Sequence, residues 1–171
     1  MTRFEQRMKE LDYSILHYRE REEGDVEFRI QEIEKRLGQR LPPDYREFLA
    51  DYGGSTFSDT FEAPITEPGH FDEYACPTAF LGFYKPKSDG SPHSLDLPDN
   101  IRYYKDRVPT ESIPIAQAIG GNLILLGVAG RDRGKVCYWD HETSDVFAVA
   151  DSFAEFLANL RLTDEDDEDD D

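Results

Sequence analysis

The sequence contains little that would form a disulfide framework, hold a zinc ion or cross a membrane. Its 171 residues include only two cysteines, Cys76 and Cys137, which lie far apart and form no CxxC pair. There is no run of about 18 apolar residues, so no membrane span is expected. The N-terminal stretch MTRFEQRMKELD is charged and lacks the apolar segment of a signal peptide. A reducing cytoplasm is therefore the expected setting.

Basic residues are scarce relative to acidic ones. Lysine and arginine total 19 and aspartate and glutamate total 37, which gives a net charge of −18. The last eight residues, Asp164–Asp171, are all acidic, and the rest of the chain has 29 acidic residues against 19 basic ones, a charge of −10. Such a surface repels nucleic-acid phosphates and attracts basic proteins. The alternative is that the acidity serves solubility alone.

The C-terminal stretch, residues 163–171, is expected to be a disordered acidic tail. A run of carboxylates has no apolar surface to bury, so it cannot offset the entropy of ordering. Two roles are open for this tail. It either mimics nucleic acid in a basic groove of a partner or simply solubilises the end of the chain.

Residues 1–162 have the composition of a single globular domain. The chain is 38% hydrophobic and 12% aromatic, which is sufficient for a buried core. Within an N-terminal helical extension, residues 1–24, apolar side chains at helical spacing predict one helix. Those side chains are Phe4, Met8, Leu11, Ile15 and Tyr18. The core of the domain then spans residues 25–162.

Two further helices are predicted at the start of this core. Asp25 is placed to cap a helix whose apolar stripe ends at Leu37, and Gly38 follows as a C-terminal cap. Pro42 and Pro43 then suit the entry to a second helix, which Gly53-Gly54 ends. The sequence thus predicts a compact helical hairpin.

The next hundred residues read mainly as strands. Asn122–Val128 and Lys135–Trp139 are apolar runs joined by the Gly-rich connector Ala129–Gly134, a pattern typical of a β-hairpin. Further elements are predicted from composition: strands at Thr78–Tyr84, Ile113–Ala118 and Asp145–Val149, an exposed loop at Lys85–His93, a short helix at Leu97–Asp106 and a last helix capped by Ser152. This order predicts an α+β fold with a mostly antiparallel central sheet, flanked by N-terminal helices and a C-terminal helix.

The sequence lacks a recognisable arrangement of catalytic residues. The Gly-rich stretch Gly130–Gly134 has no Lys-Ser/Thr of a phosphate loop, and Asp140-His141-Glu142 is explained as well by a turn after a strand. His70, Asp72, Glu73 and Cys76 could be combined with His93 or His141 as the ligands of a metal ion. Their spacing, however, matches no zinc pattern. No catalytic residue, cofactor or metal ion is therefore expected.

Acidic and aromatic side chains alternate in two segments, and this mixture is typical of a protein-binding surface. The residues predicted to contact a partner are Glu62, Glu67, Phe71, Asp72, Glu73, Tyr74, Asp140 and Glu142. Trp139 is assigned to the core because it ends an apolar strand. The alternative is that the aromatic residues are core and the acids are solvated edges.

Three segments, taken in order, resemble the SMI1/KNR4 family, also called the SUKH superfamily. They are the pattern IxEIExxLGxxLPxDYxxFLxxYGG at Ile30–Gly54, GGNLILLGV at Gly120–Val128 and GKVCYWDHE at Gly134–Glu142. The closing helix, DSFAEFLANL at Asp151–Leu160, is similar too. The family pattern has Gly-Asp where this chain has Gly121-Asn122, and His70–Cys76 has no clear counterpart in it.

This resemblance implies a non-enzymatic α+β domain without catalytic residues. Bacterial members of the family are mostly immunity proteins that bind and neutralise toxins, often nucleases, and fungal members act in cell-wall signalling. The expected function is therefore an immunity-type protein that neutralises a basic, nuclease-like toxin. The alternative is a scaffold or regulatory adaptor of the same fold that binds a host protein.

Overall fold

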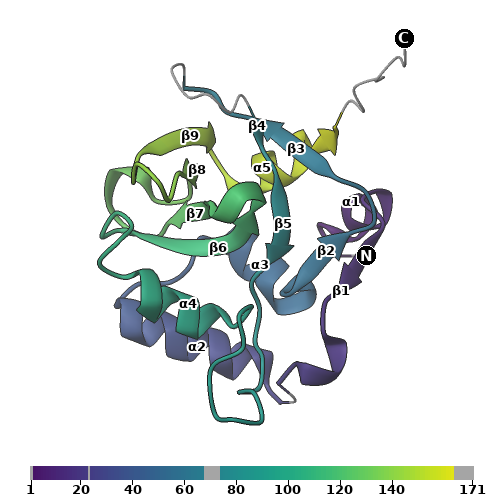
Figure 1. Ribbon diagram of the computed structural model, residues 1–171, viewed down its shortest axis with the longest axis vertical. Coiled ribbons are helices and arrows are strands. Elements are labelled where there is room, and N and C mark those ends of the chain that lie inside the picture. Colours follow the sequence, from purple (N-terminus) through teal and green to yellow (C-terminus); the bar gives the residue numbers. More distant parts are fainter. Residues whose placement is uncertain (1, 23, 68–73, 164–171) are drawn as a thin grey trace.

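A five-stranded antiparallel sheet forms the centre of the fold (Figure 1). The computed structural model describes residues 2–22, 24–67 and 74–163, so the acidic run 164–171 lies outside the described residues. The strands follow in the order β5 (Pro77–Phe80), β6 (Ser112–Ala118), β7 (Leu123–Gly127), β8 (Val136–Trp139) and β9 (Val146–Ala150). The predicted fold class, α+β with a mostly antiparallel central sheet, is confirmed.

Two smaller antiparallel sheets extend this centre. One pairs β1 (Tyr13–Ile15) with β2 (Ser55–Phe57). The other has the order β10-β3-β4, with β10 (Arg161–Leu162), β3 (Phe61–Pro64) and β4 (Tyr74–Ala75). Chain segments that are distant in sequence, near residues 62 and 161, thereby lie side by side.

The helices are α1 (Glu5–Glu10), α2 (Val26–Leu37), α3 (Pro43–Tyr52), α4 (Leu97–Tyr104) and α5 (Phe153–Asn159). Short 3-10 turns are η1 (Tyr18–Glu20), η2 (Ile119–Gly121) and η3 (Gly130–Asp132). Local signals set several boundaries as predicted. Gly38 ends α2 with a φ of 68°, Pro43 opens α3, and Ser152 Oγ accepts a hydrogen bond from the Glu155 N–H at the start of α5. No helix within the described residues has the length and apolar character needed to span a bilayer.

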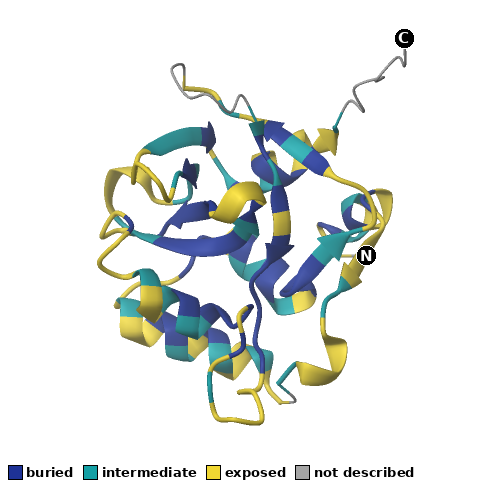
Figure 2. Ribbon diagram, in the orientation of Figure 1, coloured by how far each residue is buried: buried dark blue, intermediate teal, exposed yellow. Residues whose placement is uncertain are grey.

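The predicted hairpin of β7 and β8 is confirmed, and it lies at the centre of the core. Leu123 pairs with Trp139 across the hairpin, and all five residues of β7 are buried (Figure 2). Alternate side chains of β7 face two separate apolar clusters. Trp139 is 1% exposed in the smaller cluster, which confirms its assignment to the core.

The single helix predicted from Phe4 to Tyr18 is wrong. Helix α1 ends at Glu10, Asp12 adopts a positive φ of 48°, and the chain then enters β1. Ile15 pairs with Ser55 of β2, and Tyr18 is 71% exposed. The backbone pairing with β2 therefore overrides the helical spacing of the apolar side chains.

Helix α1 is nevertheless part of the main core. Phe4 and Met8 are buried in it together with residues of α3 and α5. Arg7 of α1 also contacts α5: its Nε donates to the carbonyl oxygen of Leu157 at 3.1 Å, and its Nη2 donates to the carbonyl oxygen of Leu160. Arg7 thus satisfies carbonyl groups that the C-terminus of α5 leaves without helical partners.

Candidate functional site

The residues predicted to contact a partner lie in three places. Phe71, Asp72 and Glu73 lie outside the described residues. Glu62 and Tyr74 belong to β3 and β4, and Glu67 is exposed a few residues beyond β3. Asp140 and Glu142 lie in the turn between β8 and β9.

Glu62 and Tyr74 share one cation. The Arg161 Nε atom lies 3.6 Å from Glu62 Oε1, and the Arg161 guanidinium lies 4.8 Å from the centre of the Tyr74 ring. The side chain of Glu62 is only 12% exposed, whereas that of Arg161 is 52% exposed. Glu62 therefore serves mainly to hold Arg161, and the cation itself is the more accessible group.

Asp140 organises the turn that carries Glu142. Its Oδ1 atom accepts a hydrogen bond from the Glu142 N–H at 2.8 Å, and its backbone N–H donates to the carbonyl of Asp145 at 3.0 Å. This is the side-chain-to-backbone pattern by which aspartate stabilises a turn. Glu142 and Asp145 are left exposed at the surface.

Asn122 fixes this acidic turn against β7. Asn122 Oδ1 lies 3.0 Å from the His141 backbone nitrogen and 2.7 Å from His141 Nδ1. An amide oxygen only accepts, so His141 carries its proton on Nδ1. Asn122 also bonds through Nδ2 to the hydroxyl of Tyr138. The Asn122 amide thus orients the His141 ring.

The η2 turn lies between the two groups of predicted residues. The Ile119 N–H donates to the Cys76 carbonyl at 3.1 Å, two residues beyond Tyr74. Gly121 has a φ of 83°, and a Cβ at this position would lie 3.4 Å from His141 Cε1. A Cβ at that distance would be in ordinary contact with the ring, so the positive φ of the turn is what favours glycine here.

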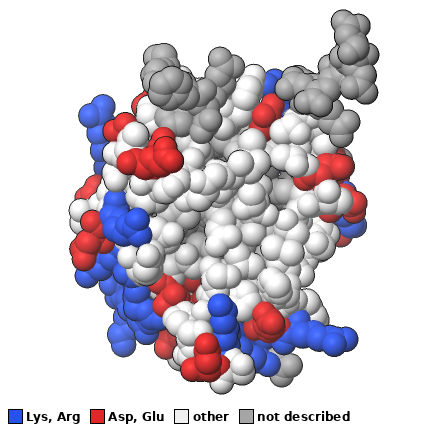
Figure 3. All heavy atoms as spheres, in the orientation of Figure 1, with Lys and Arg blue, Asp and Glu red and all other residues white. Residues whose placement is uncertain are grey.

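We call the region around this turn the η2 surface, defined by Tyr74, Ile119, Gly120, His141 and Glu142. Ile119 is 53% exposed at the turn. Figure 3 shows that the middle of this view of the molecule is largely uncharged and that charged side chains gather toward its edges. An uncharged centre with a charged rim is typical of a protein-binding surface.

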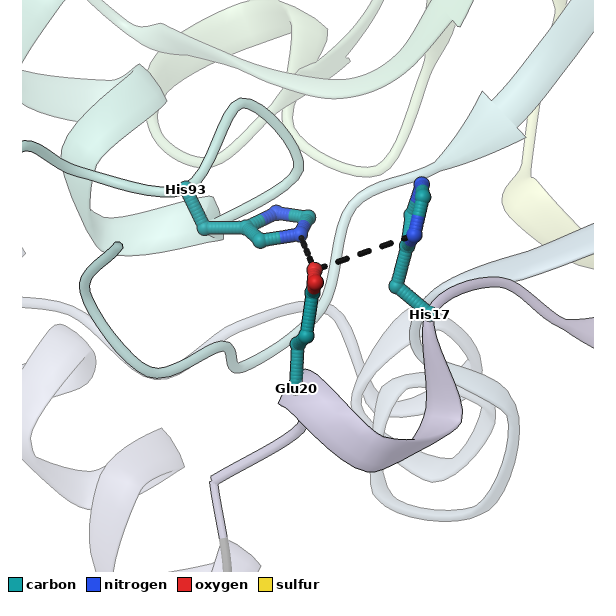
Figure 4. Close-up of side chains that lie close together, drawn as sticks. All are labelled: His17, Glu20 and His93. Atoms are coloured by element: carbon teal, nitrogen blue, oxygen red, sulfur yellow. Dashed lines mark hydrogen bonds and ion pairs between the residues drawn. The ribbon is translucent and has the colours of Figure 1, made fainter. Parts of the chain in front are cut away.

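A second cluster brings together His17, Glu20 and His93 (Figure 4). His93 Nε2 lies 2.7 Å from Glu20 Oε2, and His17 Nδ1 lies 3.7 Å from the same oxygen. Ligand atoms of all three residues lie within 4.8 Å of one another. Two imidazoles and a carboxylate at this spacing resemble the donor set of a zinc site.

The protonation of His93 argues against a metal ion at this cluster. His93 Nδ1 accepts a hydrogen bond from the Leu95 N–H at 3.1 Å, so this nitrogen carries no proton. In the neutral ring the proton is then on Nε2, where it donates to Glu20. A metal bound to Nε2 would require the proton to move to Nδ1. There it would face the Leu95 N–H, so two donors would point at each other and the hydrogen bond would be lost. The cluster is better described as a structural contact between η1 and the segment before α4.

His93 also corrects the expectation of an exposed loop at Lys85–His93. Residues 85–90 are exposed, but His93 is 5% exposed. Its ring stacks on that of Tyr84 with centroids 4.3 Å apart. A single buried histidine that follows a Pro- and Ser-rich stretch has no periodic pattern that would reveal it from the sequence.

Cys137 is predicted to react slowly with thiol reagents. Burial is the main cause that raises the pKa of Cys137 to about 11, from an ordinary value of 9.0, with further contributions from Asp132 and Glu67. Two pKa units reduce the reactive thiolate roughly a hundredfold at pH 8. We expect iodoacetamide to modify Cys137 about a hundred times more slowly in the folded chain than in the chain unfolded in guanidinium. Peptide mass spectrometry measures the two modification rates. Equal rates in the two states would contradict this expectation.

Comparison with known proteins identifies the family. The model of the SMI1 / KNR4 family (SUKH-1) matches residues 27–159. The chain belongs to this family. The SPbeta prophage-derived uncharacterized protein YokK of Bacillus subtilis (strain 168) is 31% identical, over 93% of this chain and 85% of that protein. The resemblance expected from the sequence is therefore confirmed.

The SMI1/KNR4 match runs from the first turn of α2 to the end of α5. It includes every residue of the η2 surface, and it excludes α1, β1 and η1. The residues that define the candidate partner surface therefore belong to the part of the chain that the family shares.

Proposed function

We propose that this chain is a non-enzymatic, cytoplasmic immunity-type protein that binds and neutralises a cognate basic toxin, such as a nuclease. Family membership supports the proposal, because SUKH proteins are commonly immunity proteins and are generally non-catalytic. The observation that carries the choice of a basic partner is the charge of −10 that remains without the acidic tail. A nuclease must hold phosphates and so presents a basic cleft, which an acidic protein can occlude.

The η2 surface is the proposed contact region. Ile119 and Tyr74 would supply apolar contacts, and Glu142 with the neighbouring Asp145 would supply charge at the rim. Rim charges chiefly accelerate association, whereas central apolar contacts chiefly slow dissociation. Neither a nucleic acid nor a membrane is proposed as a partner.

The proposal is tested by using the chain as bait in lysate of its source organism at low and at high salt. We expect a basic protein to be retained at low salt and its binding to weaken at high salt. We also expect the purified chain to inhibit the toxic activity of that protein. If the retained protein is acidic or is not inhibited, the toxin-neutralising function is wrong. A cell-wall or signalling protein recovered instead would favour the adaptor alternative.

Charge reversal in the β8–β9 turn should slow association with that basic partner. We expect Glu142→Lys with Asp145→Lys to lower the association rate constant roughly tenfold at low salt, with a smaller effect at high salt. The matched control is Glu5→Lys with Glu10→Lys on α1, which changes the net charge equally. Surface plasmon resonance gives both rate constants. Equal slowing by the two double variants would contradict a contact at this turn.

A further inference from the structure

A groove runs between α2 and α4, which lie side by side at the lower left of Figure 1. It is a cavity of about 300 Å³. Ile33 and Arg36 of α2 and Pro98 and Arg102 of α4 are among the residues that line it.

The floor of the groove is apolar. Ile33 and Leu37 lie one helical turn apart on α2, and Ile101 faces them from α4. Ile33 is buried, whereas Leu37 and Ile101 are half-buried and retain contact with solvent. The helices therefore leave a strip of aliphatic surface that a partner's side chains could cover.

The rim of the groove is basic. Arg36, Arg102 and Lys105 all line it and are exposed. Arg102 lies 3.3 Å from Asp99 Oδ1, but Arg36 and Lys105 form no ion pair with any residue that the structure describes. Arg29, two turns before Arg36 on α2, is by contrast paired with both Glu22 and Glu32.

Exposed cations that form no ion pair within the described residues are unexpected in a chain with 37 acidic residues and 19 basic ones. Figure 3 shows Lys and Arg side chains gathered at the lower left, where Figure 1 places α2 and α4. A group of exposed cations thus lies beside an apolar strip.

We propose that the α2–α4 groove, defined by Ile33, Leu37, Ile101, Arg36, Arg102 and Lys105, binds a segment of a partner protein that combines acidic and aliphatic side chains. The aliphatic side chains would displace water from the floor, and the carboxylates would pair with the rim. Helix-in-groove and extended-peptide recognition both use this combination. The groove shares no residue with the η2 surface, so the inference is independent of the proposed toxin binding.

Nucleic acid fits the groove poorly. Its floor offers aliphatic side chains and no aromatic platform on which bases would stack, and the charge of −18 opposes a phosphate backbone. A single anion would contact the rim cations alone. An acidic peptide with aliphatic side chains would contact both the cations and the apolar floor, so the groove favours the peptide.

The experiment is a selection of random twelve-residue peptides displayed on phage against the full chain, followed by titration of synthesised hits. We expect the enriched peptides to be rich in Asp or Glu together with Leu, Ile or Val. Arg36→Glu with Lys105→Glu should weaken the hits about tenfold or more, since two charge-assisted contacts are lost. Both positions are exposed, so folding is expected to survive, and circular dichroism checks this.

The matched control is Arg3→Glu with Lys9→Glu beside α1, which lowers the net charge by the same amount. We expect this control to leave the affinity within about twofold, because its cations are remote from the groove. Equal weakening by the two double variants would show a general charge effect and overturn the proposal. A selection that yields no acidic and aliphatic peptide, or hits that ignore Arg36 and Lys105, would overturn it as well.

Discussion

Replacing Phe48 by alanine should lower the free energy of unfolding by about 3–5 kcal/mol, the range for a phenylalanine truncated in a close-packed core. Phe48 is completely buried on α3. Its ring centroid lies 4.7 Å from that of Phe153 on α5 and 5.0 Å from that of Phe80 on β5. The substitution would therefore leave a cavity where two helices meet the central sheet.

The size of this effect depends on how far the neighbours can close the cavity. Phe4 and Tyr52 also contact the Phe48 ring, with centroids 6.1 and 5.8 Å away. These rings are held by several elements at once, so collapse around a smaller side chain is restricted. A domain of ordinary stability has only about 5–15 kcal/mol in total, so the variant should lose a large share of its stability.

Phe28→Ala provides the matched control for this prediction. Phe28 lies on α2 and is 56% exposed, so the same truncation should change the free energy of unfolding by less than about 0.5 kcal/mol. Guanidinium denaturation followed by circular dichroism compares the two variants. A loss below about 1.5 kcal/mol for Phe48→Ala would show that Phe48 is not a centre of the packing.

Replacing Arg46 by methionine should lower the free energy of unfolding by about 2–3 kcal/mol. Arg46 Nε lies 3.1 Å from Glu34 Oε1, and the Leu41 N–H donates to Glu34 Oε2 at 2.8 Å. Hydrogen bonds to Glu27 and then to Glu34 raise the pKa of Arg46 above its usual value. Methionine would leave the carboxylate of Glu34, which is 9% exposed, with only the Arg40 Nε atom, 4.0 Å away, as a cation.

A double-variant cycle separates this unpaired charge from the loss of packing. Glu34→Gln combined with Arg46→Met removes both charges, so it should be more stable than Arg46→Met alone by about 1 kcal/mol or more. Both expected energies lie at the low end of the values for buried ion pairs, because the Arg46 side chain is 20% exposed. If the double variant is less stable than Arg46→Met, the unpaired carboxylate is not the source of the loss.

Elements with strong local signals could be predicted from the sequence. Helix α3 opens at Pro43 and stops before Gly53-Gly54, and residue chemistry alone sets both ends. The β7–β8 hairpin follows from two apolar runs around a Gly-rich connector. In both cases the information lies within about twenty residues of the chain.

Elements that depend on distant partners could not be predicted. The spacing of apolar residues up to Tyr18 fits a helix, yet Tyr13–Ile15 pairs with Ser55–Phe57, some forty residues later. The same holds at the candidate site. Asn122 departs visibly from the family pattern in the sequence, but its bond to His141, nineteen residues later, depends on the fold and could not be predicted. That Glu62 and Glu142 contact a partner stays a prediction.

Helix α1 packs on α5 although it lies outside the part of the chain that the family model matches. The family match begins at residue 27, which describes what relatives have in common. Arg7 nevertheless bonds to the last turn of α5, and Phe4 packs against Phe153 with ring centroids 6.1 Å apart. The unit that packs together is therefore longer than the part that the family model matches, and a fragment cut at residue 27 would expose the hydrophobic side chains that α1 now covers.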